Sequence, residues 1–110
     1  MKAVTFIGSS KDDLRRFPST ARERAGYQLY RVQAGLDPHD WKPMPTVGTG
    51  CREIRVRAVE GTFRVLYIAT IGETVYVLHA FQKTTQKTSK ADIDLAKKRY
   101  VQIAGRNRDE

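Results

Sequence analysis

The chain has 110 residues, of which 40% are apolar and 29% are charged, and its formal net charge is +8. This length suffices for one compact domain and not for two, so we expect residues 1–110 to form a single domain. No apolar run approaches the roughly 20 residues that span a bilayer, and no signal-peptide pattern is present, so we expect a cytoplasmic protein without membrane contact. The excess of basic side chains is larger in the second half of the chain and favours a polyanionic partner, although a generic solubilising charge is the alternative.

Few residues are available for metal or thiol chemistry. Cys51 is the single cysteine, and His39 and His79 are the two histidines. An internal disulfide and a multi-cysteine zinc site are therefore excluded, and we expect no metal and no cofactor. The default expectation for Cys51 is a buried thiol that fills space. The sequence also contains no glycine-rich phosphate loop, no HExxH and no GxSxG motif.

The N-terminal part predicts one strand and then helices. Residues 3–7 are a short β-prone run that ends at Gly8, and a helical turn over residues 11–17 would stop at Pro18. A longer helix is predicted to begin at Thr20, which forms a capping-box pattern with Glu23. It would end at Gly35, with a buried face made of Ala25, Leu29, Val32 and Leu36.

The remainder predicts a β-meander and a last helix. Residues 37–50 hold three of the four prolines and are expected to be an irregular connection. Three β-prone segments, residues 51–57, 63–71 and 74–81, follow at short spacing, which only antiparallel neighbours permit. The polar residues 82–90 then precede a helix that is capped at Ser89 and buries a stripe made of Ile93, Ala96, Tyr100 and Ile103.

This order of elements predicts an α+β domain. We expect a small antiparallel-rich sheet, made of the N-terminal strand and the three-stranded meander, packed with two or three helices. Gly105 is expected to end the last helix, and residues 105–110 are expected to be a frayed polar tail.

Arginines on the predicted strands are the first candidate functional residues. Period-two alternation puts Glu53, Arg55 and Arg57 on one face of their strand. Glu53 could pair with one arginine and leave the other for a phosphate, whereas a solvated face with a Glu–Arg pair is the alternative.

Arg64 interrupts the most apolar of the predicted strands, where a charge needs a partner or a purpose. Binding of a scissile phosphate would be one such purpose. An ion pair with Glu53 on the neighbouring strand is the other.

The third strand and the connection after it hold a histidine and three lysines. His79 has the pKa range of a general acid or base, although a histidine between Leu78 and Ala80 is more often a hydrogen-bonded structural residue. Lys83, Lys87 and Lys90 follow on a polar stretch suited to a phosphate backbone, or else to a solvated linker. This set of side chains fits RNA cleavage by the neighbouring 2′-hydroxyl, which requires positioning and charge stabilisation.

Several segments together resemble a known family in their order and spacing. These are Glu53-Ile54-Arg55, Phe63-Arg64-Val65-Leu66-Tyr67, residues 77–83, residues 85–88 and residues 92–100. They are similar to the phage-derived, HigB-like branch of the RelE/ParE toxin superfamily, over residues 4–104. The resemblance implies the RelE-like fold and the toxin of a type II toxin–antitoxin pair.

The resemblance also implies roles for individual residues. Arg64 matches the strand arginine that binds the scissile phosphate, and Arg55 matches a second arginine that contacts phosphate. Lys83 occupies the basic position after the last strand, and His79 is a further candidate for proton transfer. With Arg57, Lys87 and Lys90 contacting nucleic acid, the expected activity is a ribosome-dependent, metal-independent endoribonuclease that cuts mRNA and inhibits translation.

The expected partners are the ribosome with its mRNA and a cognate antitoxin, often a helix-turn-helix DNA-binding protein. Two alternatives stay open at this point. One is a ParE-like inhibitor of DNA gyrase, which needs no cluster of Arg55, Arg64 and Lys83. The other is an inactive homologue that acts only as the partner of its antitoxin in autoregulation.

Overall fold

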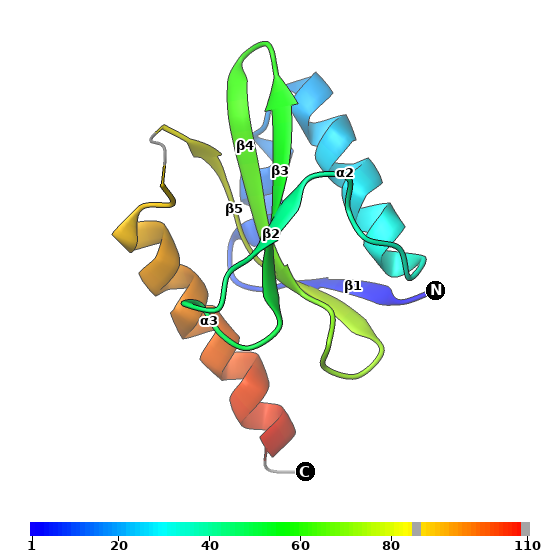
Figure 1. Cartoon of the computed structure of the whole chain (residues 1–110), viewed down its shortest axis with the longest axis vertical. Coiled ribbons are helices and arrows are strands. Elements are labelled where there is room, and N and C mark those ends of the chain that lie inside the picture. The colour runs from blue at the N-terminus through cyan, green and yellow to red at the C-terminus, as the bar shows by residue number, and fades with distance from the viewer. Residues whose placement is uncertain (85–86, 109–110) are drawn as a thin grey trace.

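A single five-stranded sheet organises the molecule (Figure 1). The computed structural model describes residues 1–84 and 87–108, without the side chains of residues 106–108. The strands lie in the order β1-β5-β4-β3-β2, with β1 parallel to β5 and every other pair antiparallel. Their bounds are Ala3–Phe6 (β1), Trp41–Pro43 (β2), Cys51–Ala58 (β3), Gly61–Ile68 (β4) and Thr74–Lys83 (β5).

Three helices cover the two faces of this sheet, with α2 and α3 on opposite sides of it (Figure 1). Their bounds are Ser10–Arg15 (α1), Ser19–Gln33 (α2) and Lys90–Arg108 (α3). Side chains of α1 and α2 pack on one face of the sheet, and those of α3 pack on the other, so two apolar clusters form. The predicted α+β architecture is thereby confirmed, with a sheet that is antiparallel except at β1.

The first cluster contains the apolar face predicted for the long helix, with one exception. Ala21, Ala25, Leu29 and Val32 are buried against Ile54, Val65 and other residues of the sheet. Leu36 lies beyond the end of α2 and is 53% exposed, so its predicted burial was wrong. The predicted capping box was also wrong, because α2 begins at Ser19 after Pro18 and has no side-chain cap.

The second cluster contains the stripe predicted for the last helix. Ala96 and Ile103 are buried, and Ile93 and Tyr100 are partly buried against them. The Asp92 backbone N–H donates to Ser89 Oγ over 3.2 Å, which confirms the predicted cap. The helix continues to Arg108, so Gly105 does not end it. Residues 109–110 of the predicted tail lie outside the described residues.

The connection of residues 44–50 also covers the α3 face of the sheet. Met44 and Val47 are buried in the second cluster, and the Tyr100 hydroxyl donates to the Thr49 carbonyl over 3.1 Å. A Cβ atom on Gly48 would lie 2.5 Å from the Tyr100 ring, so this position has no room for a side chain. The loop is therefore held against α3 by a specific contact rather than left irregular.

Three features after residue 36 differ from the sequence-based expectation. Residues 37–50, which the sequence predicts to be irregular, contain the strand β2. Pro43 is tolerated in this strand because β2 lies at the edge of the sheet, where a missing N–H removes no ladder hydrogen bond. β5 continues to Lys83, so the polar stretch begins inside a strand. β4 ends at Ile68, three residues before the predicted end.

Candidate functional site

Cations from four neighbouring strands meet on the α3 face of the sheet. Arg55 of β3 lies directly opposite Arg64 of β4 in the antiparallel ladder. Arg64 lies opposite Phe81 of β5, and Lys83 follows two residues later on the same face. At the edge of the sheet, Lys42 of β2 lies opposite Glu53 of β3. We call Lys42, Arg55, Arg64 and Lys83 the basic cluster.

Glu53 is the buried counter-charge of this cluster. It is completely buried, and its Oε1 atom accepts a hydrogen bond from Arg64 Nη1 and lies 3.8 Å from Lys42 Nζ. Its Oε2 atom accepts a hydrogen bond from the Thr88 hydroxyl over 2.6 Å. A buried carboxylate with these three partners is charge-compensated and holds the Arg64 guanidinium in one orientation.

The ion pair is the one that the sequence offered as an alternative for Arg64, and it does not test the proposed contact of Arg64 with phosphate. Glu53 pairs with Arg64 on the neighbouring strand, as one alternative for Arg64 required, and not with an arginine of its own strand. Arg64 is 6% exposed, and its Nε atom is buried without a hydrogen-bond partner among the described residues. Arg64 therefore lies beneath the surface of the cluster.

Arg55 and Lys83 lie nearer to solvent. The Arg55 side chain is 32% exposed and contacts Asp40 through Nε at 2.8 Å and Nη2 at 2.7 Å, both to Oδ1. Partial burial lowers the pKa of Lys83, and so do its cationic neighbours Arg64, Lys42 and Arg55, whereas Glu53 opposes this shift. A lysine with a lowered pKa gives up a proton more readily, which suits proton donation to a leaving group.

His79 faces α3 rather than solvent. It is 7% exposed, its Nε2 atom lies 2.6 Å from Asp92 Oδ1, and its ring stacks on Phe81 with centroids 4.7 Å apart. The second oxygen of Asp92 accepts a hydrogen bond from the Ser89 hydroxyl over 2.6 Å. His79 is therefore a hydrogen-bonded residue, which is the structural alternative that the sequence offered for it. The contact between His79 and Asp92 links β5 to the beginning of α3.

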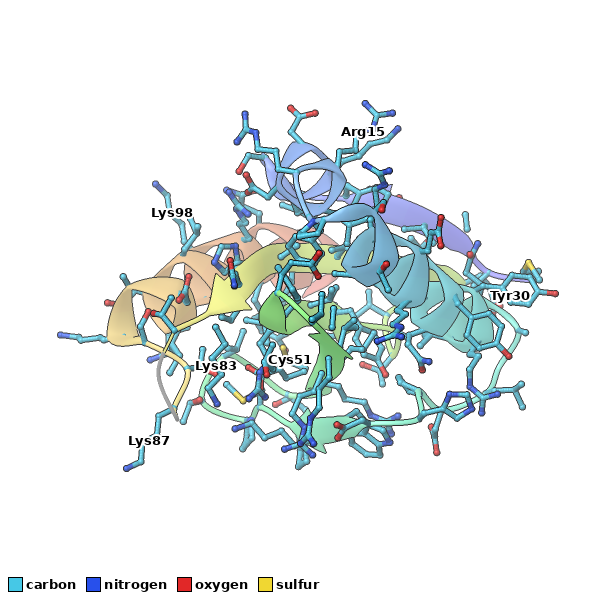
Figure 2. The ribbon with its side chains drawn as sticks, turned by 90° about the horizontal axis from the view of Figure 1, so that it is seen from above. Arg15, Tyr30, Cys51, Lys83, Lys87 and Lys98 are labelled. Atoms are coloured by element: carbon cyan, nitrogen blue, oxygen red, sulfur yellow. The ribbon has the colours of Figure 1, made fainter. Side chains whose placement is uncertain are left out.

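The remaining predicted contacts to nucleic acid lie at the surface. Arg57 is exposed and follows Arg55 on the same face of β3, where it lies opposite Thr62. Lys87 and Lys90 are exposed near the beginning of α3. Figure 2 shows Lys87 projecting on the same side of the molecule as Lys83, and Tyr30 lies toward the opposite side.

Sequence reasoning missed the contacts that four residues make with the basic cluster, Glu53 or His79. Lys42 and Asp40 were hidden because the short strand β2 was not expected. Thr88 and Asp92 contact Glu53 and His79 across 35 and 13 residues of sequence, which no local pattern encodes. The alternation of charged residues in β3 was the one available signal, since it showed which face would carry the charge.

The Cys51 thiol has no role in this site. Burial raises the pKa of Cys51 to about 12, with Glu53 adding to the shift, and the residue is 2% exposed. The described residues contain no group of three or more His, Cys, Asp or Glu side chains that could hold a metal ion. In the same part of the chain, no helix is long and apolar enough to cross a membrane.

The fold is that of RelE-like toxins. The chain is similar to a chain of the toxin–antitoxin complex RelBE2 from Mycobacterium tuberculosis, with a TM-score of 0.52 and 21% sequence identity, over 74% of this chain and 98% of that chain. No curated protein matches the chain.

A family model described as phage derived protein Gp49-like (DUF891) matches residues 12–101. The chain therefore belongs to the Gp49-like family, which is a family of RelE-like toxins. The membership in the RelE/ParE superfamily that the sequence predicted is confirmed.

Proposed function

We propose that this protein is the toxin of a type II toxin–antitoxin pair and that it cleaves mRNA on the ribosome. The observation that carries the proposal is the basic cluster, in which Arg55, Arg64 and Lys83 share one face of the sheet. An inhibitor of DNA gyrase would not require these three side chains on one surface. Membership in a RelE-like toxin family supports the same reading.

The chemistry is an internal displacement within RNA. The 2′-hydroxyl loses its proton to water as its oxygen forms a bond to the neighbouring phosphorus, the bond from phosphorus to the 5′-oxygen breaks, and a 2′,3′-cyclic phosphate and a 5′-hydroxyl result. The protein must hold the linkage in line, stabilise charge on the phosphate oxygens and supply a proton to the leaving 5′-oxygen. No step in this sequence requires a metal ion.

The residues divide these tasks according to their exposure. Arg55 is accessible and contacts the phosphate oxygens, exchanging its contact with Asp40 for one with RNA. Arg64 adds positive charge from beneath, held in place by Glu53. Lys83 stabilises charge and donates the proton, while Arg57, Lys87 and Lys90 contact more distant phosphates.

His79 has a positioning role in this proposal. Its Nε2 atom is held by Asp92, and its Nδ1 atom is buried without a hydrogen-bond partner among the described residues. We assign to it the placement of the beginning of α3, which carries Lys90. His79→Gln should therefore weaken RNA binding and leave the pH dependence of cutting unchanged, whereas a shifted pH profile would make His79 a proton-transfer group.

The proposed partners follow from the activity. The ribosome delivers mRNA in an extended form, so the protein acts in the cytoplasm. A cognate antitoxin neutralises it, as supported by the similarity to a chain of a toxin–antitoxin complex. A protein with a net charge of +8 would bind an acidic antitoxin segment with favourable electrostatics.

Mapping of mRNA 5′ ends after induced expression in growing cells tests this function. The intact protein should produce cuts within translated codons, and Arg55→Gln should lose them. Arg52→Gln is the matched control, because Arg52 is also ion-paired to an aspartate and is similarly exposed, but points to the opposite face of β3. Intact mRNA together with double-strand DNA breaks would instead assign the protein to the gyrase inhibitors.

A further inference from the structure

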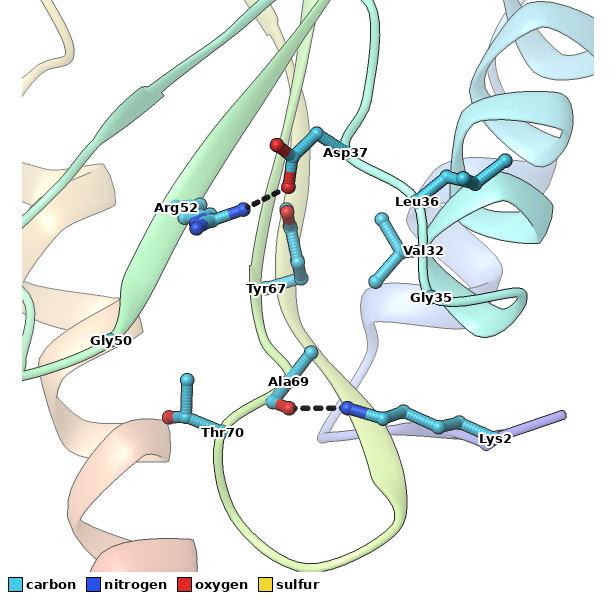
Figure 3. Close-up of a pocket in the computed structure, with 10 residues that line it drawn as sticks. All are labelled: Lys2, Val32, Gly35, Leu36, Asp37, Gly50, Arg52, Tyr67, Ala69 and Thr70. Carbon is cyan, nitrogen blue, oxygen red and sulfur yellow. Dashed lines mark hydrogen bonds and ion pairs between the residues drawn. The ribbon is translucent and has the colours of Figure 1, made fainter.

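A pocket of about 170 Å³ lies on the opposite face of the sheet from the basic cluster. It is enclosed by the end of α2 and the segment after it, by β3 and β4 near the connection of residues 69–73, and by Lys2 (Figure 3). Arg52 and Tyr67 lie opposite each other in the ladder and alternate with the residues of the other face. The pocket is therefore separate from the proposed RNA site.

Tyr67 gives this pocket a buried hydroxyl whose O–H has no acceptor among the described residues. Its side chain is 1% exposed, and its one polar neighbour with hydrogen-bonding character is the Arg52 guanidinium, which can only donate to the hydroxyl oxygen. A buried O–H without an acceptor costs free energy, so its presence calls for an explanation. Burial raises the pKa of Tyr67 and Arg52 opposes this shift, so the hydroxyl stays protonated and able to donate. Figure 3 shows the hydroxyl directed toward Asp37 and Arg52.

The other polar groups of the lining are mainly donors. Lys2 Nζ donates to the Ala69 carbonyl over 2.7 Å, and an ammonium group has two further N–H bonds. Arg52 Nη1 donates to Asp37 Oδ1 over 2.9 Å, and a guanidinium has four further N–H bonds. Asp37 is the single carboxylate of the lining, and it already has a partner.

The rest of the lining is apolar. Val32, near the end of α2, projects toward the interior of the pocket, Leu36 of the segment after α2 borders it, and Ala69 forms part of the opposite wall (Figure 3). An engineered cavity of similar size, about 150 Å³, takes up a benzene molecule. The volume thus suits a guest of about six to eight non-hydrogen atoms, with an apolar part and an acceptor group.

We propose that this pocket binds a carboxylate that carries a short apolar chain. The carboxylate oxygens accept hydrogen bonds from the Tyr67 hydroxyl and from Arg52, the chain packs against Val32 and Leu36, and Lys2 adds positive charge at the other end of the pocket (Figure 3). Such a carboxylate belongs either to a free small acid or to an acidic side chain beside an apolar one in a peptide. The proposal is independent of RNA cleavage, because it uses no residue of the basic cluster.

Titration of the ¹⁵N-labelled protein with 4-methylpentanoate, followed by NMR, tests the proposal. The backbone signals of Arg52, Tyr67 and Ala69 should shift in a saturable way, while 4-methylpentanamide and 4-methylpentylamine should leave them in place. Tyr67→Phe should raise the dissociation constant about tenfold, the effect of losing one hydrogen bond to a charged group. Asp37→Asn should lower the dissociation constant, because it frees Arg52 and removes a repulsive charge.

Opposite signs for these two variants keep the test informative even if one of them folds poorly. Three results would overturn the proposal. They are equal signal shifts with 4-methylpentanoate and its amide, tighter binding of the amine than of the acid, and weaker binding of the acid by Asp37→Asn. Acetyl-Leu-Glu-Leu-amide distinguishes the two sources of the carboxylate. Tighter binding of this peptide than of 4-methylpentanoate would assign the pocket to a protein segment, and the reverse order would assign it to a free acid.

Discussion

Removal of the Glu53 carboxylate should destabilise the protein more than the loss of any exposed ion pair would. The carboxylate is fully buried, and the partner Arg64 side chain is 7% exposed. Loss of one member of a buried pair leaves the other charge uncompensated, which costs about 3–5 kcal/mol. The free energy of unfolding of a domain of this size is about 5–15 kcal/mol, so Glu53→Ala should lose a large share of it.

Urea unfolding monitored by circular dichroism measures this loss. With a slope of about 1–3 kcal/mol per molar urea, the midpoint for Glu53→Ala should fall by about 1–5 M. Glu53→Gln keeps the shape and an oxygen for the Thr88 hydroxyl, so it should lose less, about 1–3 kcal/mol.

A double-mutant cycle isolates the pair. Replacing both Glu53 and Arg64 by leucine and methionine removes both charges, and burial of an apolar pair is often neutral or stabilising. The double variant should therefore be more stable than Glu53→Leu alone, with a coupling energy of at least about 2 kcal/mol. Additivity of the two single effects within about 0.5 kcal/mol would refute the reasoning.

Three further predictions concern protonation and packing. The rate of RNA cutting should decline as the pH rises through the lowered pKa of Lys83. Glu53→Gln should move this decline to lower pH, because the carboxylate that raises the Lys83 pKa is lost. An unchanged pH profile in Glu53→Gln would contradict the proposed role of Lys83. The Cys51 thiol, with its pKa raised to about 12, should react with DTNB at pH 8 only after unfolding, and rapid labelling of the folded protein would count against its burial. Gly48→Ala should lower the free energy of unfolding by about 1–3 kcal/mol through a clash with the aromatic ring of α3. Gly26→Ala, in open space on α2, should raise the free energy of unfolding by about 0.5–1 kcal/mol. Equal melting temperatures for Gly48→Ala and Gly26→Ala would contradict the packing described.

The sequence predicted those parts of the fold that depend on local periodicity. The meander followed from three β-prone segments at short spacing, and the buried stripe of α3 followed from its 3.6-residue period. The alternation in β3 correctly separated Ile54 and Val56 from Glu53, Arg55 and Arg57. These features required no knowledge of distant residues.

Long-range pairing could not be predicted in the same way. Pro43 and Pro45 indicated a loop, and only the sheet edge explains why a strand tolerates a proline there. The partner of Glu53 was left open because strand neighbours depend on register, which the sequence does not specify. The contacts of Asp40 with Arg55 and of Asp92 with His79 likewise arise from tertiary packing.

The most direct measurement of the proposed activity uses a reconstituted translation system with the purified protein and a defined mRNA. Primer extension should reveal 5′ ends inside codons that occupy the ribosome, and none on the same mRNA without ribosomes. Arg55→Gln and Lys83→Met should each reduce cutting about 100-fold or more, as losses of groups that stabilise transition-state charge do, while Arg52→Gln should cut normally. Full-length mRNA with the intact protein, or equal cutting by Arg55→Gln and Arg52→Gln, would contradict the role of the basic cluster.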